Sequence, residues 1–388
     1  MLPTGFQAQK ARKSRPPNNG VKWPSVQGAL LLFGCLTIYV SVYLRDAIGP
    51  SLTNVDATLL LASGVVAILI SGAARFSNYD VIVAFTFGIL ALINTSMAGG
   101  FAFSNYLIAP IIGLIISRSS RSMFMSFMIV HAIVSVVLQA YEQVIGAYIF
   151  EVVAADGSIL DNTHFAGHAG VMRAKGLFQG PLSAVAFYIL FALLSPKTLN
   201  IGLGTIGAVL AYGRLGIILM FSLFIARIFS AAGSIRRFLI ILVAAIFLYL
   251  APQIMSLPSF FTAAFDLASS GNSARIYFWQ ENLSHYLNYS AANAAFGNLG
   301  YANRVIGSTE SDFLRILMDA GFLSLFAYLI FLIGAFAKAK KIGYEKSFHF
   351  LVIGVAMAVF PFIQSLNAAI LFWIFIWGFF HGHEGLRQ

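Results

Sequence analysis

Two cations stand just before an apolar run in the stretch VMRAKGLFQGPLSAVAFY. Gly180 and Pro181 favour a turn that leads into a helix, because a proline in the first helical turn loses no hydrogen bond. Arg173 and Lys175 would then lie beside the positive end of the helix dipole and its free N–H groups. This combination suits a bound anion. Anchoring of the loop at lipid headgroups is the competing interpretation.

A single arginine, Arg214, lies in the stretch AYGRLGIIL between two apolar runs with almost no connecting loop. A guanidinium at an apolar boundary is unfavourable, by about 3 kcal/mol if it is driven to the middle of a bilayer. Snorkelling of the side chain to the interface is the structural alternative. The predicted outer side of the membrane is otherwise poor in arginine, so a functional role is favoured.

Four charged residues fall within the stretch TESDFLRILMDAG, where a further apolar run begins. Thr309 and Asp312 fit the capping-box pattern. Arg315 and Asp319 are four residues apart on one helix face and can pair, with Asp319 about two turns into the apolar run. Glu310 is left without a partner in the sequence, so we interpret it as a second cap residue or as a base.

The stretch NSARIYFWQENLSHYLNY, residues 272–289, predicts an amphipathic helix. Its apolar residues recur at helical spacing, and they are Ile276, Trp279 (or Phe278), Leu283 and Leu287. Arg275 and His285 belong to the polar face. The aromatic residues suit a membrane interface or the C–H faces of sugar rings, and a single histidine is more often structural than catalytic.

The sequence contains no pattern typical of a metal or nucleotide site. The seven histidines form no HExxH motif and have no CxxC partner, and no P-loop or dinucleotide fingerprint is present. We therefore expect no metal and no cofactor. The single cysteine, Cys35, can form no internal disulfide and is expected to pack in the core.

The elements that must position these residues are membrane helices. Of the 388 residues 59% are hydrophobic and only 10% are charged, and the mean hydropathy is +0.84. Soluble domains usually carry about 25% charged residues. The formal net charge of +10 comes from basic residues at the ends of apolar runs, which favours a positive-inside pattern and excludes a nucleic-acid partner.

Residues 1–25 predict a flexible basic cytoplasmic tail, and residues 26–388 predict one polytopic all-α domain with about twelve spans. Two long outer loops are expected at about 147–179 and 256–311, the second containing the amphipathic helix. The apolar runs are 27–44, 55–74, 79–97, 100–117, 122–146, 180–195, 199–212, 214–230, 238–255, 312–336, 347–364 and 367–381.

Orientation follows from the connecting segments. With both termini inside, the outer segments hold only seven of the 24 basic residues. Those seven are Arg45, Arg173, Lys175, Arg214, Arg275, Arg304 and Arg315. We therefore expect the candidate site residues to face the outer side of the membrane.

Four features in order resemble the bacterial O-antigen polymerase (Wzy type) and O-antigen ligase family, over residues 170–335. They are RAKGLFQGP, YGRLGI, ARIYFW leading to FGNLGY, and ESDFLRILMDAGFLSL. The resemblance implies glycosyl transfer from undecaprenyl diphosphate at the periplasmic face of the bacterial inner membrane. In that family, arginines on the outer face are thought to hold the diphosphate.

By position these arginines correspond to Arg173, Arg214 and Arg275, with Lys175 beside the first. Glu310 stands where the ligase branch usually has a histidine, which favours the polymerase. A diphosphate leaving group needs cations, and the attacking sugar hydroxyl needs a base, here Glu310. Supporting roles are expected for Asp312, Arg315, Asp319, His285 and Trp279.

The expected partners are the lipid-linked oligosaccharide and membrane lipids, and the sequence leaves open whether a chain-length regulator protein binds. A ligase that transfers finished polymer to lipid A–core is the alternative enzyme. A transporter of lipid-linked sugar or a small solute is the alternative from another class. It should place ionisable residues near the bilayer midplane, whereas here they concentrate at the outer boundary. Glu142, late in the fifth apolar run, is the one candidate exception, and a position at the outer end of that helix is the alternative.

Overall fold

The computed structural model describes residues 25–45, 54–98, 104–150, 152–153, 159–160, 172–195, 197–211, 270–306, 309, 311–359 and 361–381, with isolated positions between 216 and 240. These residues are almost entirely helical, which confirms the predicted all-α class. The exception is a short antiparallel ribbon of β1 (Val152–Val153) and β2 (Ile159–Leu160), inside the first predicted loop.

The helices lie where the apolar runs predict them, and α12 matches the predicted loop helix. The runs 214–230 and 238–255 fall almost entirely outside the described residues. The helices of the first half are α1 (Val26–Tyr39) with the π-helical turn η1 (Val40–Leu44), α3 (Asn54–Ile70), α4 (Asn78–Ala98), α5 (Asn105–Ser119), α6 (Arg121–Ile145), α7 (Pro181–Leu194) and α8 (Thr198–Leu210). Those of the second half are α12 (Ser270–Leu287), α13 (Ala291–Phe296), the π-helical turn η4 (Ala302–Ile306), α14 (Asp312–Ile342), α15 (Tyr344–Val359) and α16 (Leu366–His381).

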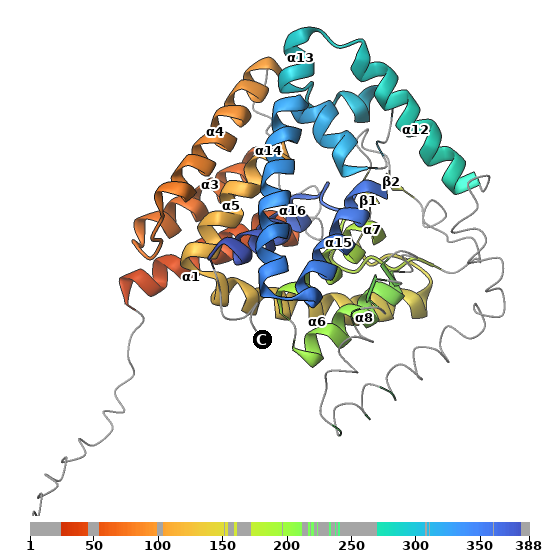
Figure 1. The fold of residues 1–388 in the computed structure, drawn as a ribbon. Coiled ribbons are helices and arrows are strands. Elements are labelled where there is room, and N and C mark those ends of the chain that lie inside the picture. Colours follow the sequence, from red (N-terminus) through yellow and green to blue (C-terminus); the bar gives the residue numbers. More distant parts are fainter. Residues whose placement is uncertain are drawn as a thin grey trace, which may run out of the picture.

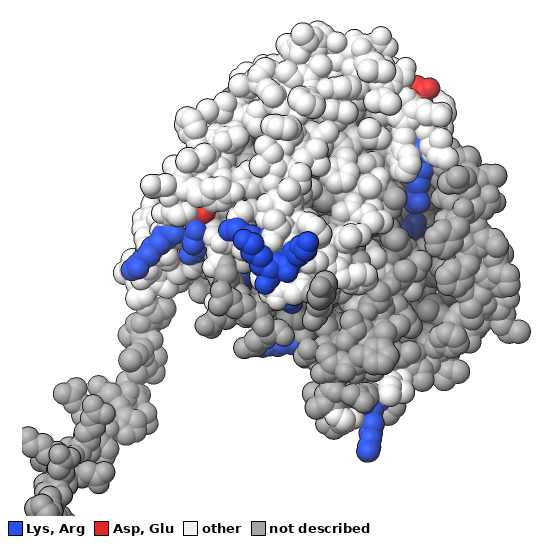
Figure 2. All heavy atoms as spheres, viewed as in Figure 1, with Lys and Arg blue, Asp and Glu red and all other residues white. Residues whose placement is uncertain are grey.

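Four helices of the described residues are long and apolar enough to cross a membrane, since a span needs roughly 20 residues. They are α1 with η1, α4, α6 and α14. Large apolar side chains on these helices are exposed, and examples are Phe85, Leu92, Val130, Val137, Phe326 and Ile333. Figure 2 shows a broad uncharged surface above a group of basic side chains. A surface of this kind suits contact with lipid tails.

Helix α16 is the core of the molecule and packs on α5, α7 and α14 (Figure 1). Its residues 368–377 are at most 1% exposed, as expected for a helix that is apolar on all sides. The indole N–H of Trp373 donates to the Tyr328 hydroxyl at 3.1 Å, and that of Trp377 donates to the Pro110 carbonyl at 3.0 Å. Both buried indoles therefore have a hydrogen-bond partner.

One end of this core is closed by a buried carboxylate. Asp80, in the first turn of α4, forms an ion pair with Arg118 near the end of α5. Its Oδ1 atom lies 3.0 Å from Nε2 of His381, the last residue of α16. Its Oδ2 atom also accepts the N–H of Ser77 at 2.8 Å. Three segments that the sequence predicts on the inner side thus meet at one carboxylate.

Candidate functional site

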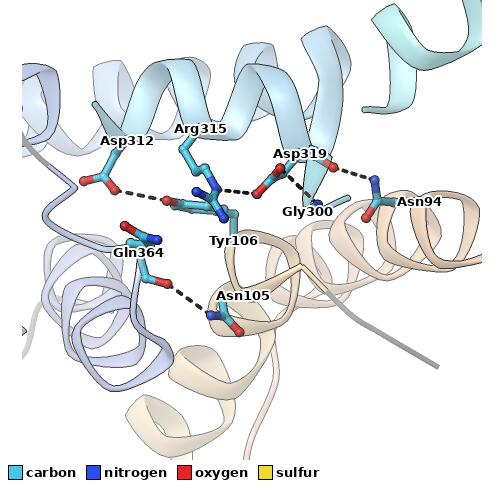
Figure 3. Close-up of polar contacts among 8 residues, drawn as sticks. All are labelled: Asn94, Asn105, Tyr106, Gly300, Asp312, Arg315, Asp319 and Gln364. Carbon is cyan, nitrogen blue, oxygen red and sulfur yellow. Dashed lines mark hydrogen bonds and ion pairs between the residues drawn. The ribbon is translucent and has the colours of Figure 1, made fainter. Parts of the chain in front are cut away.

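The carboxylate of Asp312, the first residue of α14, joins three parts of the fold, and Figure 3 shows its contact with Tyr106. Asp312 is fully buried. Its Oδ2 atom accepts the backbone N–H groups of Phe362 and Ile363, at 2.7 and 2.9 Å, in the turn before α16. Its Oδ1 atom accepts the hydroxyl of Tyr106 on α5 at 3.1 Å. Both oxygens are occupied, so this group positions other elements and does not act as a free base.

The predicted pair of Arg315 and Asp319 is present and buried (Figure 3). The Asp319 Oδ1 atom also accepts the N–H of Gly300 at 3.1 Å. On α4, the amide of Asn94 donates to the backbone carbonyls of Asp319 and Phe296, at 2.7 and 2.8 Å. The side chain and the backbone carbonyl of Asp319 therefore fix this part of α14 against the turn before η4 and against α4.

Helix α14 is broken at Gly321, whose backbone has φ 82° and ψ 173°. A side chain there would require an unfavourable left-handed conformation and would collide with the carbonyl oxygen of Ala295. The part after the break, residues 322–342, is about 30 Å long at 1.5 Å per residue. Asp319 therefore lies on a short segment before the long straight helix, and not two turns into a continuous span.

The capping-box prediction for this helix is wrong. The N-cap residue is Ser311, and no side chain of the described residues bonds to the cap. Thr309 is buried, and its hydroxyl has no hydrogen-bond partner among the described residues. Asp312 turns away from its own helix because the buried N–H groups of Phe362 and Ile363 need an acceptor.

A second buried carboxylate, Glu142, lies in the last turn of α6. Its Oε2 atom accepts the N–H groups of Lys175 and Gly176 at 2.8 and 2.9 Å. Its Oε1 atom accepts the N–H of Ile149 at 3.3 Å. Glu142 thus holds a loop at the end of its helix, which explains its place in an apolar run without a transport role.

Residues 172–178, here named the clamped segment, run along one polar face of α6. The side-chain amide of Gln143 donates to the Met172 carbonyl at 2.7 Å. Farther along α6, the Ser135 hydroxyl accepts the N–H of Leu177 at 3.3 Å. Polar side chains at helical spacing therefore fix an irregular chain that bears two of the predicted cations.

The two cations of the clamped segment differ in placement. Lys175 is fully buried, and its ammonium group donates to the Phe178 carbonyl at 3.2 Å and lies 5.8 Å from the centre of the Tyr148 ring. Arg173 is half-buried, and its carbonyl accepts the Tyr148 hydroxyl at 2.9 Å. Burial, together with the Glu142 carboxylate, raises the pKa of Tyr148 to about 12, so this phenol stays protonated and donates.

The clamped segment continues to the N-terminus of α7, which begins at Pro181. No side chain of the described residues caps this end, and Gln179 beside it is exposed. Free N–H groups at a helix start attract anions. The predicted arrangement of a cation followed by a helix N-terminus is therefore present, with Arg173 as its partly exposed cation.

Helix α12 exists as predicted, but the leucines of its predicted apolar face do not turn toward the rest of the protein. Leu283 and Leu287 are 48% and 75% exposed, whereas Asn282 is fully buried. The helix turns Asn282 inward because its neighbours are α14 and η4 and not lipid alone. Arg275 and Trp279 are both half-buried.

Several residues next to His285 were not predicted as site residues. The Tyr301 hydroxyl lies 3.1 Å from His285 Nδ1, and the rings of Tyr289 and Tyr301 lie 5.4 Å apart. Arg304 on η4 is exposed. Burial raises the pKa of Tyr289, and the Asp319 carboxylate raises it further. The recurrence of aromatic residues near His285 is the signal by which Tyr289 and Tyr301 could have been predicted. Arg304 could not be predicted in this way, because the π-helical turn that bears it has no sequence signature.

Two of the predicted site residues, Glu310 and Arg214, lie outside the described residues. Among the residues that the structure describes, no group of three His, Cys, Asp or Glu side chains could hold a metal ion. The described part of the candidate site thus consists of Arg173 and Lys175 on the clamped segment, Arg275 on α12, and the supporting framework at the start of α14.

Comparison with known proteins gives no family match for this chain. No curated protein matches it either.

Proposed function

We propose that this protein is a polysaccharide polymerase of the bacterial inner membrane. It transfers a glycan from undecaprenyl diphosphate to the end of another lipid-linked repeat unit at the periplasmic face. The observation that carries the proposal is the clamped segment, where Arg173 is fixed ahead of the uncapped N-terminus of α7. A diphosphate leaving group needs cations and N–H donors, and the clamped segment carries Arg173 toward a helix start that no described side chain caps.

The proposed topology has about twelve spans with both termini in the cytoplasm. Contacts between segments support it. Asp80, Arg118 and His381 come from three segments predicted inside, and they meet at one end of the core. Asn94 and Asp319 are both predicted near the outer ends of their helices, and they are in contact.

The proposed reaction forms one glycosidic bond and breaks one bond to phosphate. The acceptor sugar hydroxyl attacks the anomeric carbon of the donor glycan, and the bond from that carbon to the diphosphate oxygen breaks. The electron pair leaves with the diphosphate, whose charge Arg173, Arg214 and Arg275 stabilise. Glu310 takes the hydroxyl proton. Lys175 is assigned to the clamped segment itself, because its ammonium group is buried against Phe178.

The described polar groups favour an enzyme over a transporter. The buried carboxylates Asp80, Glu142, Asp312 and Asp319 all lie in the first two or last turns of their helices. A transporter would place such groups near the bilayer midplane. In addition, each of these carboxylates already binds protein donors.

The direct test replaces the proposed residues in cells that lack the chromosomal gene. Arg173→Ala, Arg275→Ala and Glu310→Gln, each present at the wild-type level, should abolish long polysaccharide on gels. Arg75→Ala is the matched control, because Arg75 is an exposed arginine in a segment predicted on the inner side. If all three variants still make full-length polymer, the site assignment is wrong.

Glycan analysis of the deletion strain separates the enzyme classes. A missing polymerase leaves single repeat units on the lipid acceptor, whereas a missing ligase leaves the acceptor bare. Purified protein in detergent that polymerises lipid-linked repeat units would exclude a transporter. Addition of a chain-length regulator protein to the same assay would show whether polymer length responds to such a partner.

A further inference from the structure

Three aromatic side chains form a half-buried cluster between α12 and η4, here named the aromatic wall. They are His285, Tyr289 and Tyr301. The ring centres of His285 and Tyr301 lie 5.7 Å apart, and those of Tyr289 and Tyr301 lie 5.4 Å apart at an interplanar angle of 88°. The wall therefore presents ring faces in different orientations, with an imidazole among them.

Polar groups surround the aromatic wall. The Tyr289 hydroxyl is buried and has no hydrogen-bond partner among the described residues. A buried hydroxyl of this kind usually has one. Arg304 is exposed on η4, and Gly300 in the preceding turn lies against its guanidinium group. Glu281 lies 3.8 Å from His285 Nε2 and is 41% exposed. Donors and acceptors thus border the rings, and one of them is unused.

The support below the wall is rigid. The N–H of Gly300, next to Tyr301, is held by the Asp319 carboxylate, which is itself paired with Arg315. From α4, the side-chain amide of Asn94 donates to the backbone carbonyl of Asp319. Binding sites are precise when their side chains stand on a fixed frame. The framework at the start of α14 therefore gives the wall, with Arg304, a defined geometry although it lies in a long connection.

We propose that the aromatic wall and Arg304 form a subsite for one pyranose ring of the acceptor glycan. This inference rests on the proposed function, because it names the part of the same site that holds the acceptor. Ring faces of the wall pack against the apolar C–H face of the sugar. The exposed Arg304 guanidinium group binds the sugar hydroxyls at its edge, and the Tyr289 hydroxyl binds one of them once the sugar has displaced the groups that cover it. The subsite takes a sugar without its lipid, whereas the arginines of the reaction take the diphosphate.

The test measures binding without catalysis. The probe is the lipid-free oligosaccharide that mild acid releases from the lipid-linked repeat unit of cells carrying this gene. Binding to the purified full-length protein in nanodiscs is followed by saturation-transfer NMR. We expect wild-type protein to bind the oligosaccharide. Tyr289→Phe should weaken binding by about 2–10-fold, the value of one neutral hydrogen bond, and Arg304→Ala by about 10–100-fold, the value of a hydrogen bond from a charged group. Both changes leave the rings in place and should not prevent folding.

The controls separate this subsite from the proposed reaction. Arg173→Ala should bind the lipid-free oligosaccharide as wild type does, although it makes no polymer. Arg75→Ala should leave both unchanged. If wild-type protein does not bind the oligosaccharide, or if Arg304→Ala and Tyr289→Phe bind it equally well, the subsite is overturned. If binding behaves as expected while the purified protein forms no polymer, the subsite stands and the polymerase proposal fails.

Discussion

Glu142 and Asp312 perform the same local task in two regions of the molecule. Each is a fully buried carboxylate near a helix end, and one of its oxygens accepts two consecutive backbone N–H groups. In both cases those N–H groups belong to a segment that leads into another helix, α7 for Glu142 and α16 for Asp312. Buried N–H groups of irregular chain need acceptors, and a carboxylate supplies two at once.

The two regions differ in what the held segment carries. Glu142 holds the clamped segment, which bears Arg173 and is followed by the exposed residue Gln179. Asp312 holds the turn before α16, which is buried over residues 367–379, and is linked through Tyr106 to α5. The first region presents Arg173 and the start of α7, and the second builds the core. The same hydrogen-bond arrangement can thus hold a segment at the surface or a turn in the core. The residues around the carboxylate decide which of the two it does.

Loss of the Asp312 carboxylate should have the largest effect. Asp312→Ala leaves the buried N–H groups of Phe362 and Ile363 without an acceptor, a cost of about 2–6 kcal/mol for the pair. Natural domains have only about 5–15 kcal/mol of stability. We expect little folded protein on size-exclusion chromatography in detergent. Asp312→Asn keeps an acceptor oxygen and should recover much of it. If Asp312→Ala melts at the same temperature as wild type, Asp312 does not stabilise the core.

The glycines of the two regions should also differ in effect. Gly321→Ala adds a methyl group against the Ala295 carbonyl at a backbone φ of 82°, and the conformation alone costs about 1–2 kcal/mol. Its melting temperature should fall by several degrees. Gly176→Ala meets the backbone of Ser135 at a φ of 59°, so it should displace the clamped segment and reduce polymer more than stability. Gly354→Ala, where nothing lies within 4 Å, is the neutral control. If Gly176→Ala and Gly321→Ala lower the melting temperature equally, the two glycines do not differ in the way expected here.

Glu142→Gln should affect activity more than stability. The amide keeps one acceptor oxygen but binds the N–H groups of Lys175 and Gly176 more weakly, by about 1 kcal/mol. A slightly misplaced clamped segment should lower polymer formation about tenfold or more, since small shifts of reacting groups can cost about 100-fold. The measurement is polymer formed per folded protein in detergent. Activity that falls only with the amount of folded protein would make Glu142 a core residue like Asp312.

Thr309→Ala should have the smallest effect. The Thr309 hydroxyl is buried without a partner among the described residues, so its removal should change stability by about 0.5 kcal/mol or less, or raise it. A capping residue would instead lose about 1 kcal/mol. Thermal unfolding in detergent, with Ser311→Ala as the neighbouring variant, decides between the two.

The helices and the local ion pair could be predicted from sequence because both depend on neighbours a few residues away. Long apolar runs predict the helices, and the spacing of Arg315 and Asp319 predicts their pair. The position of Arg173 before α7 also followed from local signals, the glycine and proline that end the loop. These interactions are settled within one or two helical turns.

The rest depends on partners that are distant in the sequence. Asp312 binds residues 50 and 51 positions away, so its local capping pattern was misleading. Glu142 binds residues 33 and 34 positions away, and nothing near it in the sequence indicates a loop to hold. The inward face of α12 is likewise set by α14 and η4. Such contacts could not be deduced from spacing alone.

The contacts of Asn94 also bear on biosynthesis. Its amide on α4 binds the carbonyls of Phe296 and Asp319, which follow it by 202 and 225 positions. At about 5–20 residues per second, the ribosome needs roughly 10–40 s to make that intervening chain. A nascent chain that is released before this point keeps an unpaired amide near the end of an apolar helix. The Asn94 amide on α4 thus finds its partners only after most of the second half of the protein has been synthesised.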